Sequence, residues 1–118
     1  MTSSVARIVA TRDEDCGTCV QIEVNLARKA GVPAVQLRAV LERRPQDLPP
    51  ALGAVYGFAE SVVTADYDDA SWREKVKTLY GEEGLVEVAL AIASARFFPV
   101  TKRALGYAVS CKKVEVCV

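Results

Sequence analysis

The chain has 118 residues, of which 51% are hydrophobic and 25% charged, the balance of an ordinary globular domain that can support its own core. Its 15 basic and 15 acidic residues cancel to a formal charge of zero. A nucleic-acid binder would need a strongly basic face, so we expect no nucleic-acid partner. We expect residues 1–118 to form a single domain.

The N-terminal residues do not resemble a targeting signal, because Arg7 interrupts their apolar run. The longest uncharged apolar run covers residues 88–95, which is too short to cross a bilayer. We therefore expect a cytoplasmic protein without membrane contact. The four cysteines agree with this, since a close CxxC pair in a cytosolic protein is more often redox-active or metal-binding than structural.

Helical patterns dominate the first half of the chain. A short helix is expected around Val5, Ile8 and Val9, ending near the acidic residues 13–15. A second helix is expected over residues 16–30, with Gly31 and Pro33 as stop signals. Its buried stripe is predicted to contain Cys19, Ile22, Leu26 and Ala30, widened by Val20, Val24 and Ala27.

Three further helices are expected between residues 33 and 81. The first covers residues 33–43, with Val35, Leu37, Val40 and Leu41 facing inward. The next opens at Pro49-Pro50 and reaches residue 65, with its buried stripe at Ala51, Leu52, Val55, Phe58, Ala59 and Val62. A short helix over residues 72–81 follows, with Ser71 as its N-cap and Gly81 as its end.

The last predicted helix, residues 84–106, is the most apolar. It carries no charge between Glu87 and Arg96, and a helix that is apolar nearly all round is expected to be buried, often between subunits. Pro99 is expected to kink or divide it. The tail alternates valine with polar residues over positions 114–118, a weak strand signal in a helical chain.

The sequence CGTC, with Cys16 and Cys19, stands at the predicted start of the second helix. A thiol near a helix N-terminus has a lowered pKa, because the positive end of the helix dipole stabilises the thiolate. Two cysteines at this spacing can also close a short disulfide, so the motif can supply a nucleophile and a resolving thiol. The alternative is that both are small side chains packed at a helix start.

Two other types of cysteine site fit the sequence less well. A zinc knuckle needs a second ligand pair, but Cys111 and Cys117 are spaced wrongly and the chain has no histidine, so we expect no metal or other cofactor. A thioredoxin-type CxxC should follow an apolar strand, whereas charged residues 12–15 precede this one. The thioredoxin fold is therefore excluded, but dithiol chemistry is not.

Glu23 follows Cys19 by four residues and lies one turn along the same helix face. Its carboxylate could accept the thiol proton as a general base. Its negative charge would also oppose formation of the thiolate. The alternative is a glutamate at the edge of the stripe that reaches solvent or pairs with a basic residue.

Three segments in order, CGTCVQIEVNLARKAGVP, ALGAVYGFAESVV and YGEEGLVEVALAIASARFFPVTKRALG, resemble the AhpD-like alkylhydroperoxidase and carboxymuconolactone decarboxylase superfamily. The resemblance implies an all-α fold with CxxC at the start of a central helix, and assembly as trimers or hexamers. In the peroxidase branch a lipoylated partner reduces the cysteine pair. Carried over, Cys19 would attack a small peroxide and Cys16 would resolve the sulfenic acid.

The chain departs from that family at two positions. The peroxidase pattern CxxCxxxH has Glu23 in place of its histidine, and no carboxylate occupies residues 2–4, near the position of a relay glutamate. We expect a CxxC-dependent thiol oxidoreductase that reduces hydroperoxides or disulfides, with Cys16, Cys19 and Glu23 as catalytic residues. The resemblance implies a lipoyl- or thioredoxin-type electron donor. The alternative is a non-catalytic helical homo-oligomer whose cysteines pack or sense oxidation.

Overall fold

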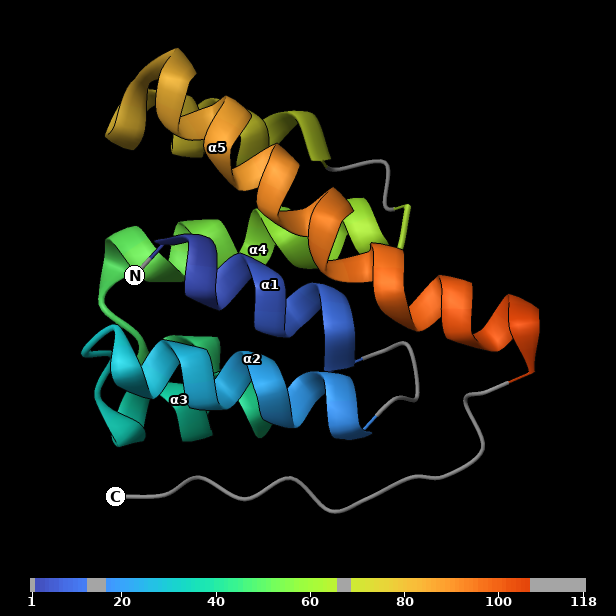
Figure 1. Ribbon diagram of the computed structural model, residues 1–118. Coiled ribbons are helices and arrows are strands. Elements are labelled where there is room, and N and C mark those ends of the chain that lie inside the picture. The colour runs from blue at the N-terminus through green and yellow to red at the C-terminus, as the bar shows by residue number, and fades with distance from the viewer. Residues whose placement is uncertain (1, 13–16, 66–68, 107–118) are drawn as a thin grey trace.

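The computed structural model describes residues 2–12, 17–65 and 69–106. Every regular element within these ranges is a helix (Figure 1), which confirms the all-α prediction. The helices are α1 (Thr2–Arg12), α2 (Gly17–Lys29), α3 (Ala34–Leu41), the short 3₁₀ helix η1 (Pro45–Asp47), α4 (Pro50–Val63) and α5 (Asp69–Leu105). The acidic residues 13–15 and the predicted tail strand lie outside the described residues.

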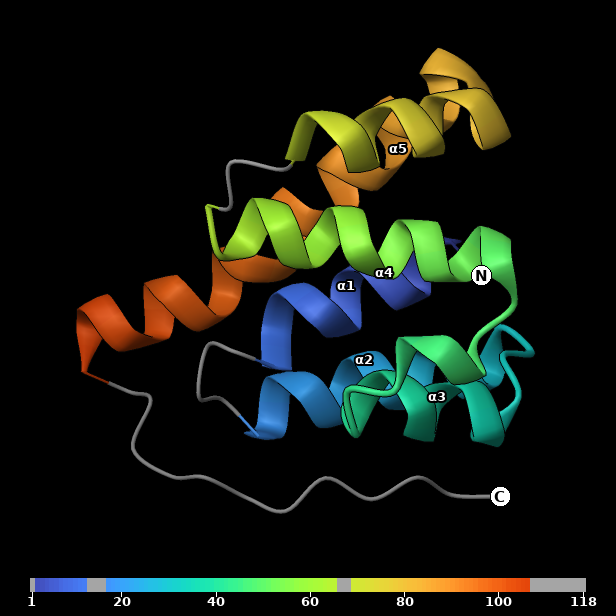
Figure 2. The same cartoon turned by 180° about the vertical axis from the view of Figure 1, so that it is seen from behind.

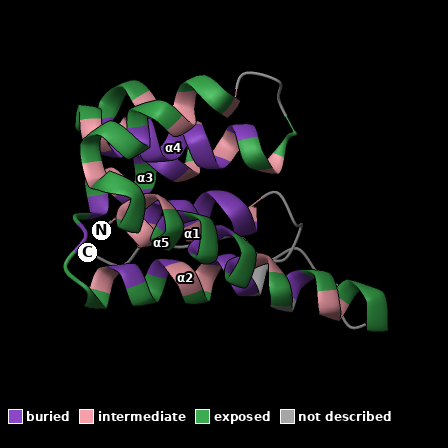
Figure 3. Ribbon diagram, turned by 90° about the horizontal axis from the view of Figure 1, so that it is seen from above, coloured by how far each residue is buried: buried purple, intermediate pink, exposed green. Residues whose placement is uncertain are grey.

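Helix α1 lies at the centre of the molecule and packs against α2, α3, α4 and α5. Figures 1 and 2 show it between a layer of α4 and α5 and a layer of α2 and α3. Most of its surface is buried, as Figure 3 shows, and the buried residues are Val5, Ala6, Ile8, Val9, Ala10 and Thr11. The family resemblance implies a central position for the helix over residues 16–30, but α1 occupies the centre.

The end of α2 follows the predicted stop signal. Gly31 has a φ of 94°, a conformation that costs glycine little because it has no Cβ. The amide of Gly31 donates to the carbonyl of Arg28 at 3.1 Å, and that of Val32 donates to the carbonyl of Ala27 at 3.0 Å. Val32, the residue after this turn, is fully buried and anchors the chain to the core.

The predicted buried stripes are partly wrong. On α2, Cys19, Val20, Val24 and Ala27 are buried as expected, but Ile22 and Leu26 are 50% and 54% exposed and Ala30 is exposed. Val35 on α3 and Val62 on α4 are also exposed. Apolar residues occupy more than one face of these short helices, so periodicity alone could not determine which face meets the core.

Helix α5 differs from the two helices predicted for the same residues. It begins at Asp69, so Ser71 lies inside the helix and is not its cap. Gly81, with φ 76° and ψ 177°, interrupts the helical conformation as predicted, and Figure 1 shows the two halves of α5 turning back along each other there. The second half continues through the buried Pro99 to Leu105, so Pro99 does not divide it.

The second half of α5 is buried on one face only. Val88, Ala91, Ile92 and Ala95 belong to the core, whereas Val86, Leu90, Phe97 and Val100 are about half exposed or more. By length and composition α5 could cross a membrane, because one of its 18-residue windows has a mean hydropathy of 1.4. Of that window, 29% is buried inside the protein. A core helix passes the same test, and α5 packs along α1 and α4.

Candidate functional site

A cavity of about 360 Å³ lies where the C-terminal part of α1, the start of α2 and the second half of α5 meet. Its size falls in the range of small-molecule sites. Its wall combines a thiol, charged groups and apolar side chains. The lining residues are Arg7, Thr11, Cys19, Ile22, Glu23, Leu26, Ser94, Ala95, Pro99 and Lys102.

Cys19 is the third residue of α2, so it lies in the first helical turn, and it is 7% exposed. This position places Cys19 at the positive end of the α2 dipole. Its side chain is on the cavity wall. Cys16, Cys111 and Cys117 lie outside the described residues.

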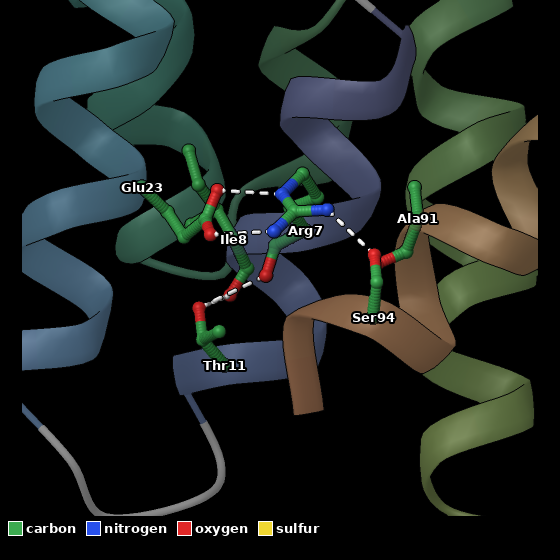
Figure 4. Close-up of polar contacts among 6 residues, drawn as sticks. All are labelled: Arg7, Ile8, Thr11, Glu23, Ala91 and Ser94. Atoms are coloured by element: carbon green, nitrogen blue, oxygen red, sulfur yellow. Dashed lines mark hydrogen bonds and ion pairs between the residues drawn. The ribbon is translucent and has the colours of Figure 1, made fainter. Parts of the chain in front are cut away.

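Glu23 and Arg7 form a two-pronged ion pair inside the cavity (Figure 4). Arg7 Nε donates to Glu23 Oε2 at 2.8 Å, and Arg7 Nη2 donates to Oε1 at 3.0 Å. The Glu23 side chain is 11% exposed. Such parallel hydrogen bonds fix the carboxylate in one orientation and balance its charge beside Cys19.

Arg7 also connects this ion pair to α5. Its Nη1 donates to Ser94 Oγ at 2.7 Å, and Ser94 Oγ in turn donates to the carbonyl of Ala91 at 3.3 Å. Arg7 and Ser94 also line a wider, open groove of about 660 Å³ between α1 and α5. One side chain of the central helix therefore organises polar groups from α2 and α5.

A buried cation, Arg12, fixes the end of α1. Arg12, whose side chain is 6% exposed, donates to the carbonyl of Val40 at 2.8 Å and to Tyr56 Oη at 3.0 Å, and it pairs with Glu60 at 3.4 Å. Burial raises the pKa of Tyr56, with the Arg12 hydrogen bond opposing this in part. These contacts hold α1 against α3 and α4 directly before the segment that carries the cysteine pair.

The structure brings together two of the three predicted site residues, Cys19 and Glu23, on one cavity wall. It adds Arg7, Thr11, Ser94 and Lys102, which the sequence pattern did not identify. Arg7 could have been identified as the single cation in an apolar helical segment. A cation on a buried helix needs a charged or polar partner. Within residues 2–12, 17–65 and 69–106, no three histidine, cysteine or acidic side chains are grouped as metal ligands would be.

No protein-family model, curated protein or solved structure matches the chain. The likeness to the AhpD-like superfamily therefore stays a prediction from the three sequence segments.

Proposed function

We propose that the protein is a dithiol oxidoreductase that reduces hydroperoxides with Cys16 and Cys19, on an AhpD-like helical frame. The observation that supports this most directly is the position of Cys19 in the first turn of α2, on the wall of a cavity large enough for a small molecule. A packing cysteine would not need such a cavity beside it.

In the proposed reaction the Cys19 thiolate attacks the terminal oxygen of a hydroperoxide, ROOH. The O–O bond breaks, Cys19 becomes a sulfenic acid, and the alkoxide leaves as ROH after taking a proton. The Cys16 thiol then attacks the Cys19 sulfur, releasing water and forming the disulfide. A dithiol donor of lipoyl or thioredoxin type returns two electrons and two protons to the pair.

Glu23 is the proposed proton carrier. The forked ion pair with Arg7 holds its carboxylate in place, and each oxygen keeps a further lone pair that can accept a proton. Arg7 acts as a positioning residue. Its positive charge offsets the repulsion that Glu23 alone would exert on a Cys19 thiolate.

The test is a stoichiometric titration with peroxide. We expect one equivalent of peroxide to remove two thiols, and mass spectrometry to find the disulfide between Cys16 and Cys19. Dithiothreitol should restore both thiols. Oxidation confined to Cys111 or Cys117 would contradict the proposal.

A second candidate function is a non-catalytic homo-oligomer whose cysteines pack or sense oxidation. It is favoured by the exposed apolar side chains Val86, Leu90, Phe97 and Val100 on α5, which suit a contact between subunits. Turnover separates the two candidates. Repeated consumption of peroxide with a dithiol donor supports the enzyme, and a single oxidation event without turnover supports the sensor.

A further inference from the structure

Part of the cavity wall is formed by large apolar side chains that the core does not bury. Ile22 and Leu26, one helical turn apart on α2, are 50% and 54% exposed, and Ala95 and Pro99 of α5 complete the apolar wall. Large aliphatic side chains beside a reactive thiol offer a surface for the alkyl part of a substrate.

Among the described residues that line the cavity, two are cations, Arg7 and Lys102, and one is a carboxylate, Glu23. Glu23 binds Arg7 with both of its oxygens. Lys102 is half-buried, and the ion pairs among the described residues do not include it. An anionic group in this cavity would therefore find an ammonium group available.

We infer that the cavity selects a hydroperoxide that carries both an alkyl chain and a carboxylate, with Lys102 binding the carboxylate and Ile22 and Leu26 contacting the chain. The inference rests on the proposed function, because it assigns the substrate class of the same site. Lys102 is the residue that determines specificity. The reaction stays balanced as written above, since the carboxylate takes no part in the transfer of oxygen.

Binding can be tested without turnover. The reduced protein is treated with iodoacetamide, and mass spectrometry follows alkylation at Cys19 in the presence of dodecanoate, dodecanol or butanoate. Dodecanoate is kept below its micelle-forming concentration and dodecanol below its solubility limit. We expect dodecanoate to protect Cys19 at concentrations about tenfold to a hundredfold lower than dodecanol, the range of a hydrogen bond to a charged group. Butanoate should protect weakly, because it lacks the chain. Equal protection by the acid and the alcohol would overturn the inference.

The matched variants are Lys102→Met and Lys75→Met. Lys75 lies over the Trp72 ring at 4.3 Å, and it is not among the cavity residues. Lys102→Met should remove the preference for dodecanoate over dodecanol, and Lys75→Met should keep it. Loss of the preference in both variants would contradict a specific role for Lys102.

Turnover provides the second readout. A long-chain fatty-acid hydroperoxide should have a kcat/KM about tenfold to a hundredfold above that of its methyl ester, and Lys102→Met should reduce this ratio towards one. If peroxides are consumed but acid and ester react equally, the inference is wrong and the proposed function stands. If dodecanoate protects Cys19 but no peroxide is consumed, the proposed function is wrong and the carboxylate site stands.

Discussion

At the scale of single residues, the ion pair between Arg7 and Glu23 alters the electrostatic environment of Cys19. A lone carboxylate one turn from Cys19 would repel a thiolate. Arg7 binds both carboxylate oxygens, at 2.8 and 3.0 Å, so the repulsion is offset while the carboxylate stays beside the thiol. This arrangement is compatible with the proposed role of Glu23 as a proton carrier.

The substitution Glu23→Gln tests this role. We expect peroxide turnover to fall by about 10²–10⁴-fold, the usual loss when a general base is removed. Cys19 should nevertheless be alkylated at lower pH than in the parent, because the Arg7 charge is no longer balanced. The measurements are peroxide kinetics and the pH dependence of Cys19 alkylation.

The control for that substitution is Glu74→Gln, which changes an exposed carboxylate outside the cavity. It should leave both profiles unchanged.

Glu23→His, which restores the histidine of the family pattern, should be at least as active as the parent, since its side chain titrates near neutrality. If the parent, Glu23→Gln and Glu23→His give the same profiles, Glu23 is a structural carboxylate and the non-catalytic candidate gains support.

The sequence could predict that Glu23 lies beside Cys19, because a spacing of four residues on one helix is a local property. It could not predict Arg7 as the partner of Glu23. The two residues are 16 positions apart and on different helices, so their contact depends on how α1 and α2 pack. The same holds for Lys102 and Ser94, which reach the cavity from the far end of the chain.

At the scale of the elements, α4 and the first half of α5 approach each other closely at Gly57. A Cβ atom placed on Gly57 would come within 2.6 Å of the Trp72 ring. On the same helix, a Cβ on Gly53 would meet only the carbonyl oxygen of Pro45, at 3.7 Å. Two glycines of one helix therefore have opposite roles, since one makes room for a neighbour and the other does not.

Replacing each glycine by alanine should give opposite effects on stability. Gly57→Ala should lower the free energy of unfolding by about 1–3 kcal/mol, the usual cost of overpacking. Gly53→Ala should raise it by about 0.5–1 kcal/mol, because alanine loses less backbone entropy in a helix. Urea unfolding followed by circular dichroism measures both. The fluorescence of Trp72, the single tryptophan, should change only in Gly57→Ala; an unchanged stability there would mean that the indole moves aside without cost.

Helix positions were easier to predict than helix faces. Proline and glycine act through their own backbone preferences, so the start of α4 at Pro50 and the interruption at Gly81 follow from local sequence. The faces of α2 and α3 depend on which neighbour covers them, and Ile22, Leu26 and Val35 were misassigned for this reason. Ser71 failed as a cap because the helix begins earlier, at Asp69.

At the scale of the whole molecule, the exposed side of α5 carries a regular apolar stripe. Val86, Leu90, Ala93, Phe97 and Val100 follow one another in alternating steps of four and three residues, and all five are exposed. This is the spacing by which helices pair along a seam. Leu90, Ala93 and Phe97 also line the open groove beside α1, so the stripe is continuous with a concave surface.

We therefore expect a homo-oligomer, a trimer or hexamer as the family resemblance implies, with this stripe at the contact between subunits. Light scattering at micromolar concentration should give the mass of an oligomer for the parent. Leu90→Glu and Phe97→Glu should each shift it towards the monomer, because they place a charge in an apolar contact. Val35→Glu is the control, since Val35 is 67% exposed on α3, away from the stripe. A monodisperse monomer in the parent would refute this expectation.

The interruption at Gly81 divides α5 into two halves that differ in burial and should unfold locally at different free energies. Before Gly81, the only residue of α5 that is fully buried among those described is Val76, whereas Val88, Ala91, Ile92 and Ala95 anchor the part after it. The break in the helical backbone lets the first half separate without disturbing the second, so its opening should require less free energy. Hydrogen–deuterium exchange should then divide α5 in two, with amides of residues 70–80 exchanging well before those of residues 88–95. Equal protection along the whole of α5 would show that the two halves open as one unit.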